Sequence, residues 1–162
     1  MPIEAVGMGE LASYPIHVAG YTRGKMLMYD AVRIDCSIAY ERSDSDLQQA
    51  ITLYLYPRST DETAQFAAEK ELVLGVHPAG KHVSDERMEL LKDGQAYPAH
   101  VATFEFEDTM NGRMQALSSQ LVLITLPTRW VKVRSTAPLA QSEIAERGML
   151  DLLDKLQWAI LK

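Results

Sequence analysis

Hydrophobic and polar residues alternate along much of the chain, and this two-residue period predicts β-strands. The clearest part is a meander of three consecutive antiparallel strands, predicted at residues 97–107, 114–126 and 130–137. Asn111-Gly112 supplies the positive backbone φ that the first hairpin turn needs. Within the middle strand the run from Leu121 to Ile124 is unbroken apolar sequence. Such a run predicts that packing elements cover both faces of the sheet.

Four more stretches ahead of the meander are predicted as strands. In chain order they are residues 17–28, with a glycine bulge, 32–40, 50–56 and 87–91. The last stretch could also form a helical turn, but Asp93-Gly94 after it is a good hairpin turn that leads straight into the meander. A strand is therefore the preferred interpretation there.

Two segments have helical spacing. Ser59 and Glu62 form a capping box that starts a helix, which ends before His77 because that residue precedes a proline. The apolar residues of this helix are Ala64, Ala67, Ala68, Leu72 and Val76. After Pro138, Ser142 is predicted to cap a second helix with an apolar stripe over residues 145–160. We expect this helix to pack on the sheet.

These elements together predict an α+β fold, with a mostly antiparallel sheet of about six strands packed by helices as an α/β/α sandwich. Residues 1–16 are predicted as an N-terminal leader segment, because glycines and a proline interrupt any period there. Residues 17–162 are predicted as a single α+β domain, since no repeat, linker or low-complexity tract divides them. A chain of 162 residues fits one domain.

Composition and charge narrow the classes of function. The chain is 47% hydrophobic and 23% charged, which is typical of a globular domain, and its net charge of −6 disfavours nucleic acid. No run approaches the ~18 apolar residues of a membrane span. The start lacks an export-signal pattern, although a periplasmic location stays open if a natural leader preceded Met1. The single cysteine, Cys36, excludes an internal disulfide and is interpreted as a buried apolar residue.

The candidate catalytic and metal-binding residues form no recognised motif. His77 and His82 flank a Pro-Gly loop and lack third and fourth ligands nearby, so a surface loop is preferred over a zinc site. His100 could act as a base with Glu105 or Asp108, yet no nucleophile elbow of the Gly-x-Ser-x-Gly kind occurs. The two acids are more simply explained as a solvated strand edge. No catalytic residue, metal site or cofactor is therefore predicted.

One constellation is a candidate binding face. Trp130, Lys132 and Arg134 alternate with valines, so one aromatic ring and two cations share a strand face if the valines point to the core. That face could receive an anionic group or an acidic peptide. Tyr54 and Tyr56 would extend it if their strand lies nearby. In the alternative interpretation, Trp130 packs under a helix while the two cations reach solvent.

Two sequences carry a resemblance to a known architecture. They are ITLYLYP at residues 51–57, followed by a capped helix, and WVKVR at residues 130–134, followed by a proline and the final helix. With the order of elements over residues 17–160, they resemble the PsbP-like α/β/α sandwich and small, mostly uncharacterised bacterial proteins of that architecture. The resemblance implies a non-enzymatic binding or assembly domain, often in bacterial envelope proteins. It carries no catalytic signature, so no functional residue is transferred.

Three functions are therefore compared. The leading one is a non-catalytic bacterial binding or assembly domain that contacts an unknown protein or small-molecule partner through a sheet face or edge. The second is a carrier of an apolar or amphipathic small molecule between sheet and helix, near Met149, Trp158, Tyr54 and Tyr56. The third is an unrecognised hydrolase that uses His100. The sequence indicates neither the ligand nor an oligomeric state.

Overall fold

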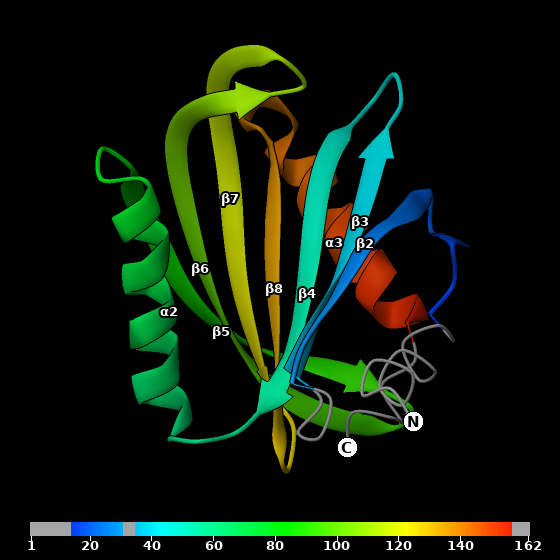
Figure 1. Ribbon diagram of the computed structural model, residues 1–162, viewed down its shortest axis with the longest axis vertical. Helices are drawn as coiled ribbons and strands as arrows, with labels where there is room; N and C mark the ends of the chain where they lie inside the picture. The colour runs from blue at the N-terminus through cyan, green and yellow to red at the C-terminus, as the bar shows by residue number, and fades with distance from the viewer. Residues whose placement is uncertain (1–13, 31–34, 157–162) are drawn as a thin grey trace.

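The computed structural model describes residues 14–30 and 35–156, and most of them lie in one antiparallel sheet of eight strands (Figure 1). The strands are β1 (His17–Val18), β2 (Tyr21–Asp30), β3 (Asp35–Ser43), β4 (Gln48–Pro57), β5 (Lys81–Lys92), β6 (Gln95–Met110), β7 (Arg113–Thr125) and β8 (Arg129–Pro138). Their order across the sheet is β1-β2-β3-β4-β8-β7-β6-β5. The helical elements are α2 (Glu62–Val76), the 3-10 turn η1 (Leu139–Gln141) and α3 (Ser142–Lys155).

The predicted fold class, an α/β/α sandwich around about six strands, is wrong. The sheet has eight strands, and in the described part of the chain a single α-helix packs against each face, so strand outweighs helix. One cause is the turn at Ala19-Gly20, where both residues have positive φ, 54° and 87°. This turn divides the predicted strand 17–28 into β1 and β2. The expected bulge does occur in β2, because the register with β3 shifts between Arg23 and Met26.

The predicted meander is confirmed. Strands β6, β7 and β8 pair in chain order, and Asn111 and Gly112 have φ of 54° and 75° at the first turn. A second predicted hairpin, at Asp93-Gly94, joins β5 to β6 with φ of 51° and 79°. Strand β5 is real but begins at Lys81, six residues earlier than expected. Asn and Asp tolerate this left-handed backbone better than most residues, which is why these two turns are legible in the sequence.

Among the described residues, alternate strand positions build the two larger hydrophobic cores, beside a small cluster of Leu47, Ala137 and Ala145. The larger core joins strands on both sides of the sheet centre to Met149, Leu152 and Leu153 of α3. The smaller core joins Phe66 and Val73 of α2 to residues of β6, β7 and β8. The apolar run of β7 alternates between these cores, as predicted: its members under α2 are Leu121 and Leu123, and those in the core of α3 are Val122 and Ile124.

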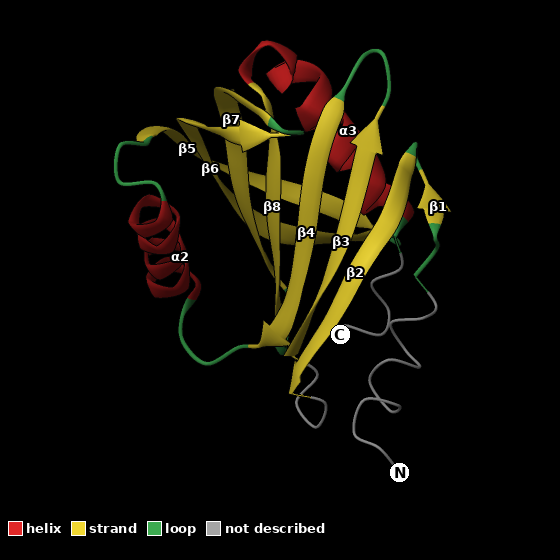
Figure 2. Cartoon of the chain, turned by 45° about the horizontal axis from the view of Figure 1, so that its top comes forward, coloured by secondary structure: helices red, strands yellow, loops and turns green. Residues whose placement is uncertain are grey.

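Helix α2 lies over one side of its sheet face. Figures 1 and 2 place it beside β5, β6 and β7, while α3 runs behind β4 and β3 on the other face. No residue of β2 or β3 belongs to the core under α2. The face of β2, β3 and the part of β4 before Tyr56 that points away from α3 therefore has no helix of the described chain over it. We call this surface the open face.

The apolar residues that were predicted to form the buried stripe of α2 face the solvent instead. Leu72 and Val76 are 62% and 75% exposed, whereas Phe66, Glu69 and Val73 are buried against the sheet. A helix that buries a glutamate and exposes a leucine needs a polar partner beneath it. The sheet provides this partner, as described below.

The cap of α2 lies two positions after the predicted residue, and that of α3 lies one position before it. The side chain of Asp61, not Ser59, caps α2 by accepting a hydrogen bond of 2.8 Å from the N–H of Ala64. Ser142 is the first residue of α3, after Gln141, which makes no side-chain capping bond. The part of the predicted stripe beyond residue 156 lies outside the described residues.

Candidate functional site

The five residues of the predicted binding face lie side by side on the face of the sheet that carries α2. In the register of β4 with β8, Tyr54 is opposite Lys132 and Tyr56 is opposite Trp130. Arg134 is two residues after Lys132 on the same face of β8. The valines between them on β8 belong to the core under α3. Because these strands are far apart in the sequence, their pairing needed the structure, but the shared face follows from the two-residue period.

Trp130 is the floor of this region, not an exposed anchor. Its side chain is completely buried in the core with Phe66 of α2 and Leu123 of β7. The guanidinium of Arg58 lies over its ring, 5.0 Å from the centroid. Its indole N–H is buried and meets no hydrogen-bond acceptor in the part of the chain that the structure describes. Trp130 thus packs under a helix, as the alternative interpretation expected.

Lys132 forms a buried ion pair with α2. Its ammonium lies 2.8 Å from Oε2 of Glu69, and Glu69 is only 6% exposed. The hydroxyl of Tyr56 and the side-chain amide of Gln65 both donate to Oε1 of Glu69, each at 2.9 Å. Burial, with the charge of Glu69, raises the pKa of Tyr56 above its ordinary value, so this hydroxyl stays a donor. The network explains why α2 faces Glu69 inward, and it neutralises Lys132.

Arg134 is embedded in the sheet without a carboxylate contact. Its Nη2 donates to Oγ of Ser119 at 2.9 Å, and that oxygen lies 3.0 Å from Oγ1 of Thr136. Its Nε is buried and has no acceptor within residues 14–30 and 35–156. None of the ion pairs within residues 14–30 and 35–156 involves Arg134. Burial lowers the pKa of Arg134, against the opposing influence of Tyr54 and Glu69.

The open face beside Arg134 carries hydroxyl groups and an exposed aromatic ring. Thr52 lies opposite Arg134 on β4, and Tyr54 is on the same face of that strand. The ring of Tyr54 also contacts Lys132, whose ammonium is 4.2 Å from the ring centroid. Further out, Tyr29 is 56% exposed and its hydroxyl lies 3.0 Å from Oγ of Ser37. Arg134 is thus at the boundary between the helix-covered part of the sheet and the open face.

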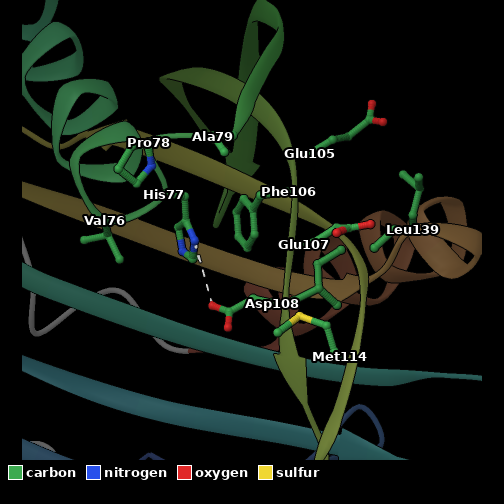
Figure 3. Close-up of a pocket in the computed structure, with 13 residues that line it drawn as sticks. Val76, His77, Pro78, Ala79, Glu105, Phe106, Glu107, Asp108, Met114 and Leu139 are labelled. Carbon is green, nitrogen blue, oxygen red and sulfur yellow. Dashed lines mark ion pairs between the residues drawn. The ribbon is translucent and has the colours of Figure 1, made fainter.

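A separate groove lies at the end of the β6–β7 hairpin (Figure 3). Its volume is about 750 Å³, which is within the range of ligand sites. The lining residues come from the loop after α2, from β6 and β7, and from η1. Because these segments are distant in the sequence, no local pattern indicated this groove.

His77 and His82, the two histidines considered as metal ligands, contact different residues. His77 stacks on Phe106, with ring centroids 3.7 Å apart, and its Nδ1 is 3.8 Å from a carboxylate oxygen of Asp108. His82 instead lies 2.8 Å from the carboxylate of Asp85. Within the described residues, no group of three or more His, Cys, Asp and Glu side chains is arranged to hold a metal.

The residues weighed for a hydrolase are not brought together. His100 is on the α2 face, where its Nε2 lies 3.8 Å from Oε2 of Glu62. Glu105 lines a pocket with α3 residues on the opposite face. Asp108 lies eight residues after His100 on the same strand, which is roughly 26 Å at 3.3 Å per residue. The contact with Glu62 was not anticipated, because Glu62 was assigned to a helix cap.

The residues weighed for an apolar carrier also separate. Met149 is buried in the core under α3, whereas Tyr54 and Tyr56 are on the opposite face of the sheet. Trp158 lies outside the described residues. These side chains therefore do not line one cavity.

Comparison with known proteins places the chain in no family. It matches no protein-family model and no curated protein. Among the described residues, no helix is both long enough and apolar enough to span a bilayer. Functional inference consequently rests on the geometry of the two sites, the Arg134 face and the hairpin groove.

Proposed function

We propose that the protein is a non-catalytic binding protein whose open sheet face receives an anionic group at Arg134. The anion would come from a protein partner or a small ligand. The observation that carries this proposal is the guanidinium itself, which is embedded in the sheet with one hydroxyl acceptor and no carboxylate contact among the described residues. A desolvated charge that makes no direct ion pair is costly, so an anion that binds there recovers free energy.

The neighbouring cation supports Arg134 as the centre of the site. Lys132 is already neutralised by Glu69, so it offers an anion little attraction. Arg134 has the chemistry for this role, because a guanidinium binds carboxylate and phosphate groups through paired N–H donors. The hydroxyls of Ser119 and Thr136 lie beside it, and because one of them donates to the other, one O–H remains to donate to a further anion oxygen.

The open face supports a ligand larger than a bare ion. Thr52 and Tyr54 lie next to Arg134 on the neighbouring strand, and Tyr29 adds an exposed ring further out. Tyrosine combines an apolar ring with a hydrogen-bonding tip, which suits contact with an organic or peptide group that carries the anion. The proposal therefore predicts that a carboxylate or phosphate is recognised together with the group attached to it.

Thermal unfolding in the presence of anions tests the proposal. Phosphate, citrate and a hexapeptide of aspartate are titrated into the wild-type protein, into Arg134→Gln, and into Arg113→Gln as a control that removes an exposed arginine on the β6–β7 hairpin. We expect at least one anion to stabilise the wild type and the control saturably, since a ligand at 100 times its Kd contributes about 2.7 kcal/mol. Arg134→Gln should lose at least tenfold in apparent affinity.

Two results would contradict the proposal. One is an equal response of the wild type and Arg134→Gln to every anion, because phosphate and citrate also stabilise proteins non-specifically and such an effect does not depend on one arginine. The other is turnover of generic ester, phosphate or peptide substrates that persists through repeated purification of the wild type. The second result would contradict the non-catalytic assignment and leave anion binding as a separate question.

A further inference from the structure

The groove at the β6–β7 hairpin combines apolar side chains with carboxylates (Figure 3). The apolar residues around Phe106 are Val76, Pro78, Met114, Leu117 and Leu139. The acidic ones are Glu105, Glu107 and Asp108, and none of the lining residues in the described part of the chain is a lysine or arginine. This surface is distinct from the open face that carries Arg134.

The loop after α2 forms a fixed wall of the groove. The N–H of Gly80 donates to the carbonyl of His77 at 2.8 Å, which closes a tight turn. A Cβ at Gly80 would lie 2.9 Å from that carbonyl oxygen, so a larger residue would push the turn open. The stacking of His77 on Phe106 then holds the loop against β6. The wall is therefore built by specific contacts and is not a loose connection.

Large apolar side chains around the groove remain in contact with water. Val76 is 75% exposed, Met114 64% and Leu139 38%. The exposed surface continues along α2 to Leu72, which is 62% exposed and one helical turn before Val76. Neighbouring exposed apolar groups of this size on a folded chain mark interaction sites. A site for a small molecule encloses most of its ligand, whereas these side chains are open, which favours a segment of another protein.

The charge of the groove determines which segment fits. Glu105 and Glu107 take part in no ion pair within the described residues, and the one ion pair of Asp108 there is the contact of 3.8 Å with His77. An adjoining pocket shares Glu105 and Leu139 with the groove and adds Glu86, Glu143 and Glu146. Carboxylates gathered around a low-dielectric surface concentrate a negative potential there.

We infer that this groove docks a basic amphipathic segment of a partner protein. An apolar side chain of the segment packs on Phe106 and Met114, and flanking lysine or arginine residues face Glu107 and Asp108. Charge complementarity decides between the occupants, because an acidic segment or an anionic lipid surface would be repelled. A second copy of this chain, with its net charge of −6, is disfavoured for the same reason.

A binding measurement on the full chain tests the inference. The probe is a fluorescein-labelled peptide of twelve residues, with leucines at helical spacing and lysines at the other positions. Its binding is measured by fluorescence anisotropy at 50 mM and 300 mM NaCl. The double variant Glu107→Gln/Asp108→Asn removes two groove carboxylates. Its matched control is Glu89→Gln/Asp93→Asn, which removes two exposed carboxylates at the other end of β5. Met114→Ser shortens an exposed apolar contact and leaves the charge unchanged.

The carboxylates and the apolar side chains that line the groove should both contribute to the affinity for the peptide. We expect the groove double variant to bind at least tenfold more weakly, the control less than twofold, and Met114→Ser about three- to fivefold, in line with the loss of one partly buried apolar contact. Equal losses for the two double variants would overturn the inference, since the peptide would then follow net charge alone. Unchanged affinity of Met114→Ser would do so too. So would spermidine or dodecylamine binding at the groove more tightly than the peptide, because the site would then serve a small cation.

Discussion

The buried ion pair between Lys132 and Glu69 offers the sharpest test of the reasoning about the sheet face. The side chains are 16% and 8% exposed, so each charge depends on the other for compensation. We consider three variants, Lys132→Met, Glu69→Leu and the double variant that combines them. Each replacement keeps roughly the volume of the side chain and removes its charge, so the effects report electrostatics more than packing.

The structure sets the size of the expected effects. Removing one partner of a buried ion pair costs about 3–5 kcal/mol, because the other charge stays desolvated. Lys132→Met should fall near the lower limit, since Tyr56 and Gln65 still donate to Glu69. Glu69→Leu should cost about 1 kcal/mol more for the loss of these hydrogen bonds. The double variant should cost clearly less than the sum of the two single variants, which gives a favourable coupling of about 2–4 kcal/mol.

Equilibrium unfolding in urea measures these free energies. Fluorescence is a suitable probe, because Trp130 lies in the core under α2, next to the ion pair. With a slope of about 2 kcal/mol per molar urea, a loss of 3 kcal/mol lowers the midpoint by about 1.5 M. A cost below about 1 kcal/mol for Lys132→Met would refute the reasoning. The pair would then be screened by water, and Lys132 could no longer be set aside in favour of Arg134 as the anion site.

Two other predictions concern the core under α3. Gly148→Ala should destabilise the protein by about 1–2 kcal/mol in urea, because the new Cβ would overlap the hydroxyl of Tyr21. This clash outweighs the gain of up to about 1 kcal/mol in helix propensity. A Gly148→Ala variant more stable than the wild type would contradict this, as would a Gly148→Ala/Tyr21→Phe variant no more stable than Gly148→Ala. Burial raises the pKa of Tyr21 and of Tyr40 to about 12. Unfolded tyrosines ionise near pH 10, so the unfolded chain loses protons first and the free energy of unfolding should fall from pH 10 to 12. Unfolding curves at pH 9, 10.5 and 11.5 check this, and a Tyr21→Phe/Tyr40→Phe variant that declines as steeply as the wild type would disprove it.

The sequence predicted the elements with strong local signals. The meander followed from alternation and from the Asn111-Gly112 turn, and the apolar run of β7 indicated that both faces are covered. The turn at Ala19-Gly20 was missed because alanine has no preference for a positive φ, here 54°. That omission contributed to the wrong strand number and fold class.

The orientation of α2 and the contents of the sites needed tertiary information. An apolar spacing at residues 64–76 indicates a helix but not which face it buries, and the decisive partner of Glu69 is Lys132, far along the chain. The sequence did predict that Trp130, Lys132 and Arg134 share a face, because a strand has a strict two-residue period. The groove could not be predicted from the sequence, since it is assembled from a loop, a hairpin and a 3-10 turn.

The junction of β4 with β8 has a consequence for how the protein folds. Strands β1 to β4 pair with their sequence neighbours, and so do β5 to β8, whereas the contact between these two groups joins distant parts of the chain. Closing a long loop costs more entropy than closing a hairpin, so this central seam is expected to form after the hairpins. Tyr54 and Lys132 pair across that seam. The surface proposed to bind an anion would thus be completed only at the final stage of assembly, and a partly folded chain would lack it.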